Sequence, residues 1–281
     1  TLTGLIDWLG RIIPRIVVRG IQLGLGLQLT TLALKDYVPR DGAKGFVLAA
    51  IAFVASLFLL QNRKYPAALF VIFIGLIYAL IFKLNLSSAT ENVGFNLPKI
   101  HAPDFKNIWA GFILLALPQV PLSIGNSILA AKQTAHDLFP ERPLSLRKIS
   151  FTYSIMNLVN PFFGGIPTCH GSGGLAGHYA FGARTGGSVI IYGILYLTLG
   201  FFFSGGFENI IQIFPLPVLG VILLFEGIAL MLLIRDAADS KENFFLVLLV
   251  GLIASGLPYG YLIALIVGTI LVYALPGFRS E

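Results

Sequence analysis

Long apolar runs separated by short polar segments dominate the hydrophobic pattern of this chain. Runs of this length predict helices that span, or nearly span, a lipid bilayer. They lie at about 16–34, 46–61, 66–84, 107–131, 149–163, 188–205, 216–234, 243–257 and 259–275. Several hold only about 15 residues, short of the roughly 20 that a straight span needs, so we expect these to be tilted or buried among other helices.

Proline interrupts the run at 107–131. Pro118 and Pro121 each remove a backbone donor and disturb the helical hydrogen bonds. The uncharged polar side chains that accompany them at membrane depth are Gln119, Ser123, Asn126 and Ser127. Irregular backbone at that depth persists only where it is buried in protein or lines a cavity. The pattern therefore predicts a broken helix beside a substrate cavity, or else a proline kink whose freed groups bond to Ser and Asn.

A second interruption covers residues 160–187, where nine of 28 residues are glycine. Pro161 predicts the end of a helix, because the residue before proline avoids the α region. After a short extended crossing, a new helix is expected to start at Thr168 or His170. Bare amides at a helix N-terminus bind anions, so an oxyanion is expected at residues 171–173. The alternative is that these glycines allow a close helix crossing.

The composition agrees with a membrane protein and excludes most other classes. Hydrophobic residues make up 56% of the chain and charged residues only 11%, and the mean hydropathy is +0.86. A soluble domain would carry about a quarter charged residues. The net charge of +6 is therefore assigned to helix ends at the cytosolic face rather than to nucleic-acid binding. The single cysteine excludes an intrachain disulfide.

Basic residues also predict the topology. Counting the glycine-rich stretch as a tenth, re-entrant or broken segment puts both ends of the chain on one side. Twelve basic residues flank the segments on that side, against six on the other, which predicts cytosolic ends of a multi-pass protein in a plasma or inner membrane. Because the first residue is Thr1, we expect the chain to be a fragment or to lack its start.

Single side chains give weaker predictions. Cys169, His170 and His178 suggest a metal site, but no carboxylate with suitable spacing accompanies them, so neither a metal nor a cofactor is expected. His170 is expected to donate to an anion or carry a proton, or else to be a hydrogen-bonded core histidine. Glu226 lies deep in a span, where a carboxylate is either functional or ion-paired with an arginine such as Arg19.

Two further patterns are expected to be structural. The small residues Gly20, Gly24 and Gly26 form a face that allows close helix packing. The charges of Arg235–Asp236 and of residues 239–242 predict a solvated loop.

Three motifs resemble signature segments of the molybdate transporters related to the sulfate permeases. They are Arg-Gly-Ile-Gln-Leu-Gly-Leu-Gly at 19–26, Pro-Gln-Val-Pro-Leu-Ser-Ile-Gly-Asn-Ser at 118–127, and Gly-Ile-Pro-Thr-Cys-His-Gly-Ser-Gly-Gly-Leu-Ala-Gly at 165–177. The resemblance covers nearly the whole chain. It implies an all-α fold of fourteen membrane segments in two inverted repeats of seven, divided into a core and a gate, with the substrate between two half-helices near the midplane.

The resemblance also implies a division of this chain. Residues 1–84 correspond to gate-type helices of the first repeat, with four earlier segments missing, and 85–105 form a linker loop. Residues 106–187 correspond to core-type broken helices with the substrate site, and 188–281 hold one more core helix and the second-repeat gate. The resemblance therefore implies that half of the binding site comes from segments outside this polypeptide.

The predicted function is that of a secondary transporter for molybdate, a tetrahedral oxyanion, with proton coupling. The residues expected to bind the anion are Gln119, Ser123, Asn126, Thr168, His170, Gly171, Ser172 and Gly173, and the candidate coupling residues are His170 and Glu226. The expected partners are the oxyanion, the lipid bilayer and a second copy in a homodimer, without nucleic acid. The alternatives are a sulfate or other inorganic anion permease, or an anion channel. An intramembrane enzyme built on Cys169 and His170 lacks a positioned acid, so no enzyme activity is expected.

Overall fold

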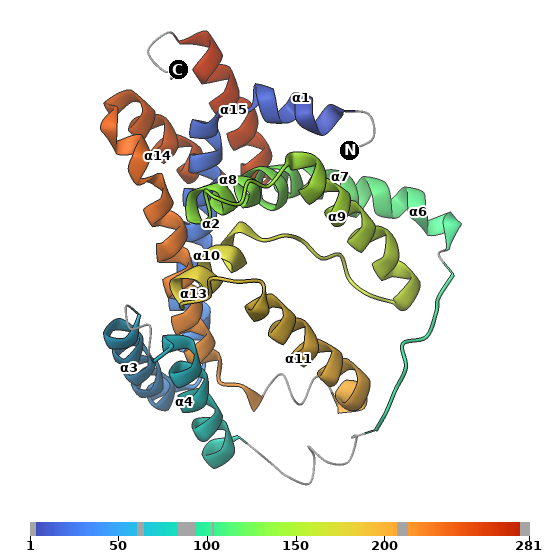
Figure 1. The fold of residues 1–281 in the computed structure, drawn as a ribbon, viewed down its shortest axis with the longest axis vertical. Coiled ribbons are helices and arrows are strands. Elements are labelled where there is room, and N and C mark those ends of the chain that lie inside the picture. Colours follow the sequence, from blue (N-terminus) through green and yellow to red (C-terminus); the bar gives the residue numbers. More distant parts are fainter. Residues whose placement is uncertain (1–3, 61–64, 84–93, 103, 207–212, 276–281) are drawn as a thin grey trace. The chain divides into compact units, whose positions relative to one another are not determined.

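The computed structural model describes residues 4–60, 65–83, 94–102, 104–206 and 213–275 (Figure 1). Every regular element among these residues is a helix, which confirms the all-α prediction for the described part of the chain. The segments long and apolar enough to cross a bilayer are Arg15–Tyr37, Gly42–Leu59 and Leu216–Asp239, and the shorter apolar helices are Ala67–Phe82, Gly187–Phe203 and Gly260–Ala274. The full number of about ten segments, and their arrangement in two repeats of seven, stay predictions.

The chain forms two compact units. Unit 1 comprises Thr1–Leu29, Ile100–Ala176 and Glu226–Glu281, and unit 2 comprises Thr30–Lys99 and Gly177–Phe225. All eight residues predicted to bind substrate belong to unit 1. Residues 85–93 and 103 of the predicted linker at 85–105 lie outside the described residues, and residues 94–102 within it have no regular structure.

Unit 1 holds most of the described helices. Its elements are α1 (Leu5–Ile12), most of α2 (Arg15–Leu32), α6 (Phe105–Gly111), η2 (Phe112–Ala116), α7 (Leu117–Leu122), η3 (Ser123–Ala130), α8 (Ala131–Leu138), α9 (Leu146–Val159), η4 (Asn160–Phe163), the start of α10 (Ser172–Ala180), the end of α13 (Leu216–Leu232), η6 (Leu233–Asp239), α14 (Lys241–Gly256) and α15 (Gly260–Ala274).

The core of unit 1 forms where α2 packs against α14 and α15, which run side by side (Figure 1). Small residues on α2 bring the backbones together. A β-carbon added at Gly24 would lie 2.7 Å from Ala254 Cβ on α14, and one added at Gly26 would lie 2.7 Å from the Gly227 carbonyl oxygen of α13. Gly20 is packed in the same way against Val250. The predicted packing role of these glycines is therefore confirmed, since close backbone approach is what small residues contribute in membrane helices.

A charge network around the buried Arg19 joins α2 to two other elements of unit 1. Arg19 is only 3% exposed. Its Nε donates to both oxygens of Asp236 in η6, at 3.0 and 3.2 Å, and its Nη2 donates to Oδ2 at 2.6 Å. Its Nη1 donates to Asp137 of α8 and, at 3.0 Å, to Gln22. Because its donors are met by two carboxylates, the arginine can lie in an apolar interior.

This network corrects two expectations. Arg19 pairs with Asp137 and Asp236, so the proposed ion pair between Arg19 and Glu226 is wrong. Asp236 was expected in a solvated loop; it is exposed, but it lies in the 3-10 helix η6 and accepts from Arg15 as well, at 2.6 Å. Sequence spacing gave no sign of this pairing, because Asp236 is more than 200 positions away from both arginines.

Residues 105–138 form one continuous helical segment rather than a broken helix. The α-helical turns of α7 are flanked by the π-helical segments η2 and η3, and the residues at the junctions, Leu122 and Ser123, keep right-handed helical dihedral angles. A wider π-turn shifts hydrogen bonds by one residue, which lets a helix accommodate proline without ending. Such π-bulges are frequent at functional sites.

Unit 2 contains α3 (Gly42–Leu59), α4 (Ala67–Phe82), α11 (Gly187–Phe203) and the first part of α13. Its core includes Val71, Val218 and Phe225, and the Phe225 ring stacks on Phe53 with centroids 5.5 Å apart. Many large apolar side chains are exposed on its helices, as in Ile191 of α11 at 71%. Exposed apolar surface of this extent fits contact with lipid rather than water.

Candidate functional site

The glycine-rich stretch of unit 1 connects α9 to α10. Helix α9 ends at Val159, the short helix η4 follows, and Gly164 then adopts the left-handed conformation with φ of 67°. That φ is open to glycine at little cost. Residues 165–171 have no regular structure, and α10 begins at Ser172. The predicted helix start in this stretch is therefore confirmed, two residues after His170.

Two asparagines hold the irregular residues against the end of α9. Asn157 donates from Nδ2 to the Thr168 carbonyl oxygen at 2.8 Å, and its Oδ1 accepts from the Thr168 backbone amide at 3.0 Å. Asn160 donates to Thr168 Oγ1 at 3.0 Å and to the Ile166 carbonyl oxygen at 3.1 Å. The backbone amide of Thr168 is thus engaged, and its hydroxyl oxygen accepts a hydrogen bond while the O–H stays available to donate, so these contacts fix the approach to α10.

His170 also contacts α9. Its Nε2 lies 2.8 Å from Thr152 Oγ1, and its ring is tilted against Tyr153 with centroids 6.4 Å apart. The Tyr153 hydroxyl in turn lies 2.8 Å from Ser123 Oγ. The sequence analysis missed Tyr153, Thr152 and Asn157 as partners of the predicted residues. Their signal was weak, because polar residues on an apolar helix show a partner only once the following segment is placed.

One hydrogen bond brings the two interruptions of the sequence together. Ser172, the first residue of α10, is fully buried and donates from Oγ to Asn126 Oδ1 at 2.6 Å. Asn126 lies in the π-helical segment η3. The Oδ1 atom of Asn126 accepts this hydrogen bond. Its Nδ2 is a donor with no hydrogen-bond partner among the described residues. An amide donor and the amides at the start of α10 thus lie at the same junction.

A carboxylate lies beside this junction. A β-carbon added at Gly173 would lie 2.5 Å from Glu226 Oε1 and 3.3 Å from Leu29 Cδ1. A side chain at position 173 would therefore push the Glu226 carboxylate away from its observed position beside α10. Within the described residues Glu226 has no hydrogen-bond or ion-pair partner. Gly171 differs, because the nearest atom to an added β-carbon there is the Gly174 nitrogen at 3.8 Å.

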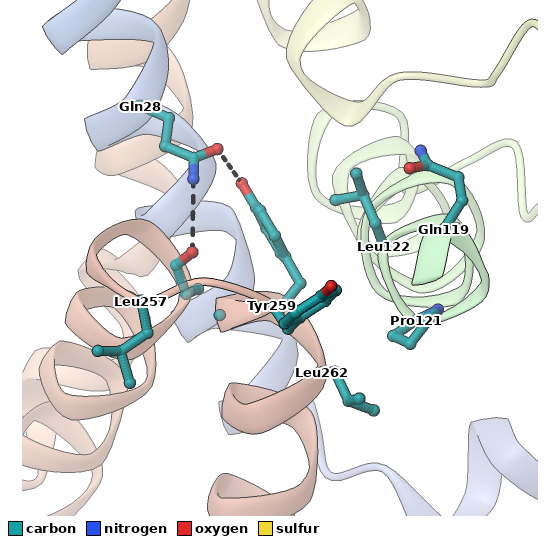
Figure 2. Close-up of a pocket in the computed structure, with 10 residues that line it drawn as sticks. Gln28, Gln119, Pro121, Leu122, Leu257, Tyr259 and Leu262 are labelled. Atoms are coloured by element: carbon teal, nitrogen blue, oxygen red, sulfur yellow. Dashed lines mark hydrogen bonds between the residues drawn. The ribbon is translucent and has the colours of Figure 1, made fainter. Parts of the chain in front are cut away.

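Gln119 lies elsewhere in unit 1. It is on the wall of a cavity of about 200 Å³ whose lining includes Gln28, Pro121, Tyr259 and Tyr261 but neither Asn126 nor Ser172. Figure 2 shows Gln119 across this cavity from Gln28 and Tyr259. The structure thus brings together Asn126, Ser172, Gly173 and Glu226. Ser123, Thr168 and His170 bond to residues of α9. Gln119 lines a separate cavity.

The described residues hold no group of three or more His, Cys, Asp or Glu side chains that could bind a metal ion. Cys169 is exposed and free. The chemistry that the junction offers is therefore hydrogen-bond donation from neutral groups, next to one carboxylate.

Comparison with known proteins points to one class of transporter. Residues 111–230 match the family model described as molybdate transporter of the MFS superfamily, and this range includes Asn126, Ser172, Gly173 and Glu226. Molybdate transporter 1 of Arabidopsis thaliana is 34% identical over 86% of this chain and 62% of its own length, and molybdate transporter 2 of that plant is 35% identical over 88% and 62%. Molybdate transporter 1 of Chlamydomonas reinhardtii is 32% identical over 74% of this chain and 41% of its own length.

The chain spans about three fifths of the length of the two plant relatives. The apolar helices and these matches support an integral membrane protein. Over most of its length, the chain is thus similar to molybdate transporters.

Proposed function

We propose that this chain forms part of a secondary transporter that moves molybdate across a membrane. The observation that carries the proposal is the 2.6 Å hydrogen bond from Ser172 to Asn126, which joins the start of α10 to η3. The anion would accept hydrogen bonds from Asn126 Nδ2 and from the amides of residues 171–173. Backbone amides at a helix N-terminus favour an anion, and glycine lets it approach closely.

Glu226 is proposed as the coupling residue. A carboxylate near a bound dianion repels it, by about 4 kcal/mol for each pair of unit charges 4 Å apart at an effective dielectric constant of 20. Protonation of Glu226 removes this repulsion, so anion binding would bring a proton with it. His170 is the second candidate, since its ring nitrogen bonds to Thr152 Oγ1 at 2.8 Å. Neutral donors also suit sulfate, so a sulfate or other anion permease is the alternative within the same mechanism.

The remaining parts of the proposal follow the resemblance to the sulfate permease-like fold. The helices would belong to two inverted repeats of seven segments, with residues 106–187 in the core and the flanking helices in the gate. Both ends of the chain would face the cytosol, and the assembly would be a homodimer.

Calorimetry in detergent tests the substrate. We expect molybdate to bind the wild-type protein, and Asn126→Leu to weaken binding by 10- to 100-fold, because one charge-assisted hydrogen bond contributes about 1.5–3 kcal/mol. Sulfate titrated in parallel separates a molybdate site from a general oxyanion site. Unchanged affinity in folded Asn126→Leu protein would contradict the proposed site. Uptake that persists after the proton gradient collapses would favour a channel.

A further inference from the structure

The cavity of about 200 Å³ in unit 1 has a polar lining that the proposed substrate site does not use. Its walls are Gln28 of α2, three residues of α7 (Gln119, Pro121 and Leu122), Ala254 of α14, and the turn between α14 and α15 with the first residues of α15. Figure 2 shows these elements around the cavity. No charged side chain is among the lining residues.

Backbone strain marks one wall of this cavity. Tyr259 has φ of 55° and is the one non-glycine residue with positive φ in the described part of the chain. A bulky residue in the left-handed region costs about 1–3 kcal/mol and persists only where surrounding structure enforces it. Gly260 provides that enforcement, because a β-carbon there would collide with carbonyl oxygens of Ile253 and Ala254. Glycine or asparagine would adopt this φ at a lower cost than tyrosine.

Two side-chain donors of the cavity have no partner among the described residues. They are the amide of Gln119 and the hydroxyl of Tyr259, which come from α7 and from the α14–α15 turn (Figure 2). The other polar groups are engaged with each other. Tyr261 donates to Gln28 Oε1 at 2.7 Å, and Gln28 Nε2 donates to the Ala254 carbonyl oxygen at 3.4 Å. Gln119 and Tyr259 are both exposed, Tyr259 at 68%, so their free donors are accessible to a ligand.

We propose that this cavity is a second binding position for a small tetrahedral oxyanion, separate from the Asn126–Ser172 junction. The inference rests on the proposed transport of such an anion. A tetrahedral oxyanion only accepts hydrogen bonds, so it matches two free donors on different walls. A cavity of about 200 Å³ also leaves room for part of the hydration shell, since each water occupies about 30 Å³ in the liquid. Neutral donors bind an anion weakly, and weak binding is needed at a position that the anion must leave during transport.

Calorimetric titration with molybdate in detergent tests the second position. We expect a tight and a weak binding event in the wild-type protein. Gln119→Leu and Tyr259→Phe should weaken the weak event at least tenfold and leave the tight event within twofold, whereas Asn126→Leu should do the reverse. Tyr273→Phe serves as a matched control, because its hydroxyl donates to the Ile12 carbonyl oxygen away from the cavity.

The strain at position 259 supplies a second readout. Tyr259→Gly should raise the melting temperature, because glycine adopts this φ freely, while the weak event is lost. A lowered melting temperature with the weak event intact would show that the tyrosine only packs, and would overturn the inference. A single event in wild-type protein that Asn126→Leu removes would also overturn it and leave the proposed function standing. If no molybdate binds at all, both proposals fail.

Discussion

At the scale of single residues, Gly173 and Glu226 constrain each other. A β-carbon added at Gly173 would lie 2.5 Å from Glu226 Oε1, so the absence of a side chain at Gly173 leaves room for the carboxylate beside the start of α10. A change in the charge of Glu226 would therefore change the electrostatic energy of an anion bound at the start of α10.

Molybdate affinity should depend on pH through Glu226. The dianion requires a protonated carboxylate beside it, so affinity should fall as pH rises and Glu226 ionises. Glu226→Gln should keep the high affinity and remove this dependence, because glutamine mimics the neutral acid. The measurement is calorimetry across a pH series, with His170→Gln as the comparison. If Glu226→Gln retained the wild-type pH profile and His170→Gln lost it, the histidine would be the coupling residue instead.

Part of the site could be predicted from the sequence because its signals were local. Pro161 and the glycines after it predicted where α9 ends and α10 begins, within a few residues. Thr168 and His170 bond to Asn157, Asn160 and Thr152, and their role in substrate binding stays a prediction. Those partners depend on how the segment folds back onto the helix, which no local pattern specifies.

At the scale of elements, α2, α8 and η6 are held together by Arg19. The pairing of Arg19 with Asp137 and Asp236 closes a network inside an apolar unit. The sequence could predict α2 and its glycine face from spacing alone. It could not predict this network, because the partners come from distant segments and Asp236 follows a basic residue as in an ordinary polar loop.

Removal of one carboxylate from this network should destabilise unit 1. Asp236→Asn should lower the free energy of unfolding by about 1.5–3 kcal/mol, the contribution of hydrogen bonds to charged groups, while Asp137 still compensates part of the arginine charge. Asp239→Asn is the matched control, because Asp239 is exposed at the end of the same helix η6. Thermal unfolding in detergent compares the two variants. Equal melting temperatures would show that the network is not a stabilising feature.

The helix at 105–138 shows a second limit of sequence reasoning at this scale. Two prolines predicted a break, but the helix continues through π-helical turns on both sides of α7. Proline has no backbone N–H to donate to the helical hydrogen bonds. Its presence alone does not determine whether the helix ends or continues through a wider π-helical turn. That choice depends on packing around Ser123 and Asn126, whose side chains bond to Tyr153 and Ser172.

At the scale of the whole molecule, the hydrophobic pattern predicted the class of protein and most of its helices. The number of spans and the repeat arrangement depend on how helices cross the bilayer. The bias of basic residues still makes a definite prediction, which places Thr1 and Glu281 on the cytosolic side.

Cysteine accessibility tests this topology. Single cysteines are introduced at 206–214 in a Cys169→Ser background. They should react with an impermeant reagent in intact cells, because a topology with both ends in the cytosol places this segment outside the cell. Cysteines near Thr1 should react only after permeabilisation. The reversed pattern would contradict the assignment of both ends to the cytosol.

The central claim is that an oxyanion binds the bare amides at the start of α10, and glycine substitution tests it most directly. At both Gly171 and Gly174 an added β-carbon would find room: its nearest neighbour at Gly171 is 3.8 Å away, and at Gly174 nothing lies within 4 Å. Gly171→Val should therefore fold with a near wild-type melting temperature but lose at least tenfold in molybdate affinity, because the branched side chain keeps the anion from several donors. Gly174→Val, whose side chain enters open space, should retain most of the affinity. Calorimetry beside thermal unfolding measures both quantities, and a well-folded Gly171→Val protein with wild-type molybdate affinity would contradict the account.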